Sequence, residues 1–179
     1  MKTILFVPLR DYYQSRKHIW SKFILPLIVS CASLGIAFAL NIGNEETVRA
    51  TFSEFISVQI NVVAILVSFS VAIISILVSA ENANIRKLKE EKSDNKHYNP
   101  VNGKQLSLFQ ILLSNIAYNV IIEIVYLILL IGLSLLRPTI PIAALKYITT
   151  VCIFTIMHIL CVLLESVAQM YLTFWQNHT

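Results

Sequence analysis

Two acidic residues and one histidine interrupt the long apolar segments in the second half of the chain. Glu123 lies near the middle of segment 106–136, and His158 and Glu165 lie in segment 143–171. An ionised carboxylate is costly to bury in a membrane, so Glu123 is expected to be protonated, paired or hydrated. Ionisable groups in such segments are candidates for a functional site.

Polar residues share one face of each segment when both are drawn as helices at about 100° per residue. The first face carries Ser114, Asn115, Tyr118, Asn119, Glu123 and Tyr126, and the second carries Thr155, His158, Cys161, Glu165 and Gln169. Antiparallel packing would place Glu123 level with His158. It would also place Glu165 level with Asn115 and Tyr118. The predicted intramembrane polar cluster is Asn115, Tyr118, Asn119, Glu123, His158 and Glu165.

Two interpretations of this cluster stay open. Its members can be polar contacts that fix how the helices pack, each worth less than about 1 kcal/mol in a membrane. They can instead line a hydrated path for ions or protons, gated where Glu123 and His158 meet. The chain shows no inverted repeats of broken helices, which are typical of many transporters.

Four apolar helices must position these residues. Of the 179 residues, 56% are hydrophobic and 13% are charged, and the mean hydropathy is +0.71. This is too little charge to cover a soluble domain, so we expect an integral membrane protein. Segments 23–40, 57–80, 106–136 and 143–171 are each long enough to cross a bilayer. The predicted fold is an all-α four-helix bundle, with a single transmembrane domain over 1–179.

Basic residues predict the orientation of the bundle. Most of the 14 Lys and Arg residues lie in the segment 1–22 and in the loop 81–105. The positive-inside rule therefore places both termini and this loop in the cytoplasm, with the spans in a bacterial inner membrane. Segment 1–22 also carries aromatic residues, a mixture typical of a segment at the lipid interface. Direct binding of nucleic acid is not expected.

The second span is predicted to continue into the cytoplasm as a helix to about residue 92. Good helix formers follow Ala80, and no breaker occurs before Asn99-Pro100. The loop 81–105 is the largest feature outside the membrane, so we expect it to bind a soluble cytoplasmic protein. Its candidate contact residues are basic: Arg86, Lys87, Lys89, Lys92 and Lys96.

Small residues line one face of each of the first two spans. They are Cys31, Gly35 and Ala39 in the first, and Ser57, Asn61, Ala64, Ser68, Ala72, Ser75 and Ser79 in the second. Membrane helices associate through small residues because their backbones can then approach closely. These two faces are therefore predicted to pack against each other.

No enzyme motif is present. The chain lacks a glycine-rich phosphate loop, a paired-cysteine motif, a Gly-x-Ser-x-Gly elbow and a metalloprotease helix. Cys31, Cys152 and Cys161 lie inside apolar segments, without the spacing of a metal site. We therefore expect a non-enzymatic protein that uses no cofactor and no metal.

The compact four-span layout resembles small membrane components of bacterial anti-phage defence systems, such as the membrane subunit of the Kiwa system. The junction that carries the resemblance is Ser79-Ala80-Glu81-Asn82 followed by Ile85-Arg86-Lys87-Leu88-Lys89. The resemblance implies a homo-oligomer, with a tetramer as the expected state, that senses disturbance of the membrane by phage. It also implies a separate cytoplasmic effector, but it carries over no functional residue.

The function predicted from these observations is a homo-oligomeric membrane sensor or anchor that recruits an effector through the loop 81–105. Changes in bundle packing would be transmitted to this loop. The alternative is a membrane-permeabilising effector, or a small ion or proton channel, that uses Glu123, His158 and Glu165. A phage holin fits the length and the number of spans less well.

Overall fold

The computed structural model describes residues 6–39, 44–80, 83–94, 97–101 and 103–175, and the regular elements in these ranges are helices. Four of these helices are long and apolar enough to cross a membrane. They are α3 (Ser21–Ala39), α4 (Glu45–Ser79), α6 (Leu108–Leu136) and α7 (Ile142–Trp175). The predicted all-α bundle of four membrane-spanning helices is therefore confirmed in its secondary structure.

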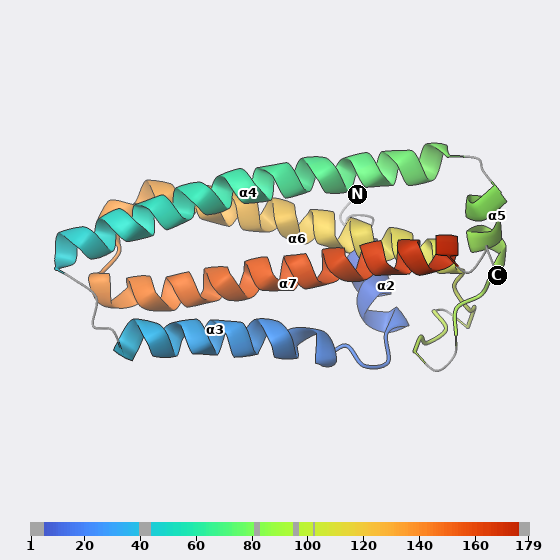
Figure 1. Ribbon diagram of the computed structural model, residues 1–179, viewed down its shortest axis with the longest axis horizontal. Helices are drawn as coiled ribbons and strands as arrows, with labels where there is room; N and C mark the ends of the chain where they lie inside the picture. Colours follow the sequence, from blue (N-terminus) through green and yellow to red (C-terminus); the bar gives the residue numbers. More distant parts are fainter. Residues whose placement is uncertain (1–5, 40–43, 81–82, 95–96, 102, 176–179) are drawn as a thin grey trace.

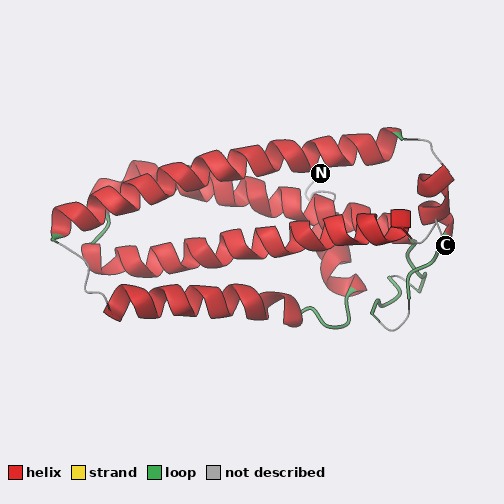
Figure 2. Cartoon of the chain, viewed as in Figure 1, coloured by secondary structure: helices red, strands yellow, loops and turns green. Residues whose placement is uncertain are grey.

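The four long helices run up and down beside one another (Figure 1). α4 packs along α6, α6 along α7, and α7 along α3, so the first two spans lie on opposite sides of the bundle. Figure 2 shows that loops are confined to the two ends of these helices. The prediction that the first two spans pack against each other is wrong.

Bulky residues explain this arrangement. α4 buries Phe52, Ile56, Val63 and Leu77, while its small-residue face is exposed along its whole length. The heptad spacing from Ile56 to Leu77 keeps these side chains on one stripe that faces the neighbouring helices. The small-residue faces of α3 and α4 are therefore left uncovered in the single chain.

Caps define where two of the long helices begin. The Oδ1 atom of Asn44 accepts a hydrogen bond from the backbone N–H of Thr47 at 3.0 Å, which caps α4. Ser107 and Gln110 form a reciprocal capping box at the start of α6. Both caps satisfy backbone donors that have no partner within the helix.

The second span does not continue as one helix to residue 92. α4 ends at Ser79, the backbone at Ala80 is extended, and a separate helix, α5 (Ala83–Glu90), follows. Ile85 of α5 joins Leu77 and Leu112 in a buried cluster. Burial of this side chain requires the chain to turn back towards α6, so tertiary packing overrides the helix propensity of the sequence.

The surface of the bundle is apolar around its middle. Ile65, Ile76, Ile128 and Leu164 are each more than 60% exposed. Such a surface is unfavourable in water and matches the hydrocarbon core of a bilayer. The outer surface therefore agrees with the hydropathy of the sequence, and buried polar residues such as Asn115, Asn119 and Glu123 lie inside.

Candidate functional site

A short N-terminal helix forms one wall of the candidate site. α2 (Val7–Ser15) lies crosswise to the long helices and packs against α6 (Figure 1). Tyr12 is 0% exposed, and Arg16, which follows α2, is 7% exposed. The bundle supplies partners for both side chains, while Tyr13 and Trp20 of the same segment are exposed. The expectation that residues 1–22 lie at the lipid interface stays a prediction.

Arg16 is the centre of a buried ionic network. Its Nη1 atom donates to Glu165 Oε1 at 2.8 Å, and its Nη2 atom donates to Asn115 Oδ1 at 2.8 Å. The Nζ atom of Lys22 lies 3.0 Å from the other oxygen, Glu165 Oε2. Two cations thus face one carboxyl group. We call Arg16, Lys22, Tyr98, Asn115, Glu165 and Gln169 the Arg16 network.

Side chains extend this network to the loop 81–105. Asn115 Nδ2 donates to Gln169 Oε1 at 3.0 Å, and Gln169 Nε2 donates to the Tyr98 hydroxyl oxygen at 2.8 Å. Burial raises the pKa of Tyr98 above its ordinary value, so its phenol is neutral at physiological pH. A loop side chain is therefore bonded directly to the polar interior of the bundle.

Backbone hydrogen bonds join the same loop to the chain around Arg16. The N–H of Asn99 donates to the carbonyl of Ser15 at 2.7 Å, and the N–H of Lys17 donates to the carbonyl of His97 at 3.3 Å. These bonds flank the residue that contacts Glu165. A displacement of Arg16 must therefore move the loop or break these bonds.

Aromatic residues form a second buried group beside the network. The rings of Tyr12 and Tyr118 stack with centroids 3.8 Å apart, and the guanidinium carbon of Arg16 lies 4.6 Å from the Tyr12 centroid. Burial raises the pKa of Tyr12 to about 12. Tyr118 and His158 share a hydrogen bond of 2.8 Å between Oη and Nε2, and Phe23 stacks on the imidazole at 4.7 Å.

Glu123 belongs to a third group, between α4 and α6. Its Oε1 atom accepts hydrogen bonds from Ser70 Oγ at 3.1 Å and from Asn119 Nδ2 at 2.7 Å. Glu123 and Ser70 are 0% exposed. The other carboxyl oxygen has no hydrogen-bond partner among the described residues, and no described Lys or Arg contacts the carboxyl group. A protonated acid is the form that this environment favours.

The structure thus divides the six predicted cluster residues among three groups. Glu165 and Asn115 lie at one level, as predicted, and Arg16 joins them. The predicted pairing of Glu123 with His158 is wrong, since their hydrogen bonds go to other residues. The wide polar face of α6 meets two neighbouring helices. Asn115 and Tyr118 bond towards α7, whereas Glu123 bonds towards α4.

Three site residues, Arg16, Tyr12 and Ser70, were not predicted from the sequence. The two N-terminal residues share their segment with exposed basic and aromatic residues, and no local signal distinguishes them. Ser70 carries a usable signal, because it continues the heptad of Ile56, Val63 and Leu77 on the buried stripe of α4. A serine on such a stripe indicates a polar partner on the neighbouring helix.

The predicted partner-binding residues lie at the α5 end of the bundle. Arg86, Lys87, Lys89 and Lys92 are exposed, and Lys96 lies outside the described residues. A recess of about 450 Å³ opens between α5 and the start of α6. It is lined by Lys89, Glu90, Lys92, Gln105, Ser107, Phe109 and Gln110. The basic side chains therefore lie beside a hollow in the surface.

The three groups offer charge, hydrogen bonds and aromatic contacts. In the described ranges no cluster of three or more His, Cys, Asp or Glu side chains could hold a metal ion. The geometry suits the transmission of a packing change, because α2, α6, α7 and a loop meet at one buried ion pair.

Comparison with protein families, with characterised proteins and with solved structures finds no match.

Proposed function

We propose that this protein is a non-enzymatic membrane sensor or anchor that recruits a soluble protein through the loop 81–105. The supporting observation is the connection between the Arg16 network and this loop, through Tyr98 and Gln169. A shift of α7 relative to α6 would separate Glu165 from Asn115, which Arg16 bridges. The shift would then be transmitted to the loop as a change in its position.

The proposed partner surface is the exposed basic face of α5 with the adjacent recess. Ile85 and Leu88 anchor α5 to the bundle at 3% and 2% exposure, so its charged side chains face outward. A surface of this charge is complementary to an acidic segment of a partner protein. The basic residues also support the cytoplasmic location of this end, in the inner membrane of a bacterium.

The proposed assembly is a homo-oligomer, with a tetramer as the expected state. Gly35, Ala64 and Ala72 lie on small-residue faces that the single chain leaves exposed. Such faces favour helix association within a membrane. The resemblance to membrane components of anti-phage systems supports a role in sensing disturbance of the membrane by phage.

Charge reversal on α5 tests recruitment. The variant with Arg86, Lys87, Lys89 and Lys92 changed to Glu keeps Tyr98 and the loop backbone in place. Crosslinking in intact membranes, followed by quantitative mass spectrometry of captured proteins, should show loss of the partner from this variant. The single change Lys104→Glu, at another exposed position in the loop, is the control. Equal capture by the variant and the wild type would overturn the proposal.

A second candidate function is a small ion or proton channel. It is favoured by buried polar atoms without a partner in the described residues, at Glu123, Asn119 and His158, where water could bind. Purified protein in liposomes should then conduct ions or protons, and Glu123→Gln should reduce the flux. Absence of flux in membranes that also support partner recruitment would rule out this function.

A further inference from the structure

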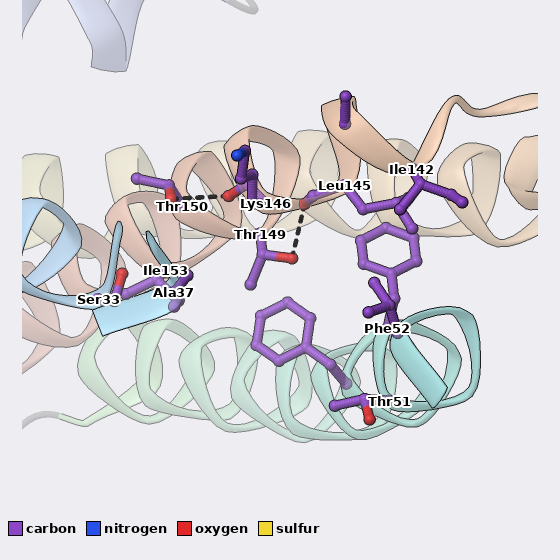
Figure 3. A pocket seen from close by; sticks show the side chains of 13 residues that line it. Ser33, Ala37, Thr51, Phe52, Ile142, Leu145, Lys146, Thr149, Thr150 and Ile153 are labelled. Atoms are coloured by element: carbon purple, nitrogen blue, oxygen red, sulfur yellow. Dashed lines mark hydrogen bonds between the residues drawn. The ribbon is translucent and has the colours of Figure 1, made fainter. Parts of the chain in front are cut away.

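A pocket lies at the end of the bundle opposite to α5. Its volume is about 410 Å³, within the range of small-molecule sites. Figure 3 shows Ser33 and Ala37 from α3, Phe52 from α4, and Lys146 and Thr149 from α7 around it. The complete lining is Ser33, Ala37, Val48, Thr51, Phe52, Phe55, Ile142, Ala143, Leu145, Lys146, Thr149, Thr150 and Ile153.

Three of the four hydroxyl groups of this lining are already hydrogen-bonded within the protein and do not require a polar ligand. Thr149 donates to the carbonyl of Leu145 at 2.9 Å, and Thr150 donates to the carbonyl of Lys146 at 2.8 Å (Figure 3). Ser33 likewise donates to the carbonyl of Ser30, at 2.8 Å. The remaining wall is largely aliphatic and aromatic, so the pocket favours an apolar occupant.

Lys146 is the single formally charged residue of the lining. Its Nζ atom lies 3.7 Å from the ring centroid of Phe38 and 5.6 Å from that of Tyr147. Among the described residues no carboxylate forms an ion pair with it. A cation on an apolar stem, beside an apolar pocket at the end of two spans, is complementary to an anionic lipid.

We propose that this pocket binds one acyl chain of an anionic phospholipid from the bilayer, with the phosphate at Lys146. The chain replaces water at Phe52, Phe55 and Ile153, and the phosphate supplies the anion that Lys146 lacks within the protein. The site lies at the end of the bundle away from α5 (Figure 1), so it does not depend on the proposed recruitment of a partner.

Native mass spectrometry of the full chain tests the proposal. Delipidated protein is titrated with phosphatidylglycerol and, in parallel, with phosphatidylcholine. The wild type should bind one phosphatidylglycerol more tightly, and Lys146→Gln should reduce this preference about fivefold. The control Lys104→Gln removes an exposed lysine of the loop 81–105 and should leave the preference unchanged.

A second variant tests the contribution of the pocket separately from that of the Lys146 charge. Ala37→Phe places a larger side chain within the lining. It should weaken the binding of both lipids by at least about tenfold, while the preference for phosphatidylglycerol persists. If this variant fails to fold, Thr149→Leu provides a smaller obstruction in the same pocket. The proposal is overturned if Lys146→Gln keeps the full preference. It is also overturned if a folded obstructed variant binds both lipids as tightly as the wild type.

Discussion

Two carboxyl groups in the same bundle, one fully buried and one partly buried, are held by opposite chemistry. Glu165 lies between two cations, with Arg16 at 2.8 Å and Lys22 at 3.0 Å. Glu123 lies among neutral groups, and its two hydrogen bonds come from Ser70 and Asn119. The comparison shows that the bundle holds one carboxyl group with charged partners and the other with neutral partners.

The surroundings explain the difference. Glu165 has a side chain that is 19% exposed, and it lies near the end of α7, where the N-terminal segment can reach it with two cations. Glu123 is 0% exposed and lies in the middle of α6, where no described Lys or Arg contacts its carboxyl group. A charged partner can therefore stabilise the first group, whereas a proton is the simplest way to neutralise the second.

Removal of the Arg16 guanidinium from the Arg16 network should have the largest effect on the free energy of unfolding. Arg16→Met leaves Asn115 without its donor and one oxygen of Glu165 without its closest cation. We expect the free energy of unfolding to fall by about 3 kcal/mol, as for other broken buried ion pairs. Reversible unfolding in detergent and SDS measures this change.

Arg10→Met is the matched control for this change, because the Arg10 side chain is 54% exposed and 3.7 Å from Asp11. Arg10→Met should lower the free energy of unfolding only slightly, since exposed ion pairs contribute little to stability. Equal losses for Arg10→Met and Arg16→Met would show that the buried ion pair does not stabilise the fold.

The same Glu→Gln change at the two carboxyl groups tests the comparison directly. Glu165→Gln leaves Arg16 and Lys22 without an anion, and should cost about 2–3 kcal/mol of unfolding free energy. Glu123→Gln replaces one neutral group by another of the same shape, and should cost less than about 1 kcal/mol. The unfolding assay in detergent and SDS measures both.

Infrared spectroscopy gives an independent measure of the same difference. A protonated carboxyl band should be present in the wild type at neutral pH and should disappear in Glu123→Gln. Glu165→Gln should leave this band in place. A spectrum without the band, together with a large cost for Glu123→Gln, would mean that both carboxyl groups are ionised.

Alkaline pH should weaken the aromatic group that lies between the two carboxyl groups. Burial raises the pKa of Tyr12 to about 12 in the folded protein, against 10.0 for the free side chain. Its contribution to stability is therefore complete below pH 10 and is lost as the pH rises through about 12, because the unfolded state releases the proton first.

The variant Tyr12→Phe isolates this contribution. Its hydroxyl has no hydrogen-bond partner among the described residues, so the variant should match the wild type at pH 7. Between pH 10 and 12 it should lose less stability than the wild type, by up to about 2 kcal/mol. Parallel pH curves for the two proteins would contradict the assignment.

The smallest effect on the free energy of unfolding is expected for Ser70, which donates to Glu123. Ser70→Ala removes one of the two hydrogen bonds to Glu123 and should cost about 0.6 kcal/mol, the average for such bonds in membranes. Ser68→Ala is the control, because its exposed hydroxyl bonds to the carbonyl of Ala64 on its own helix and to no other described residue. A loss for Ser70→Ala that exceeds the loss for Glu165→Gln would reverse the order of the two groups.

Local sequence predicted where the helices lie in the chain better than it predicted which residues pack against one another. The start of α4 follows from Asn44 and the two glutamates after it, since the cap and the helix dipole act within one turn. The break at Ala80 was missed because it depends on Ile85, whose burial partners lie on α4 and α6. Arg16, Lys22 and Tyr98 of the Arg16 network were also missed, because they come from parts of the chain far in sequence from Asn115 and Glu165.

Hydropathy and span length were sufficient to determine four long helices and an outer surface suited to lipid, because these properties depend on residues close in sequence. The tertiary structure alone decided that α6 and α7 separate the first two spans. It also decided that Arg16 meets Glu165 while Glu123 meets Ser70. The physical reason is that an ion pair or a hydrogen bond acts over a few ångströms, so its partners depend on how the helices pack.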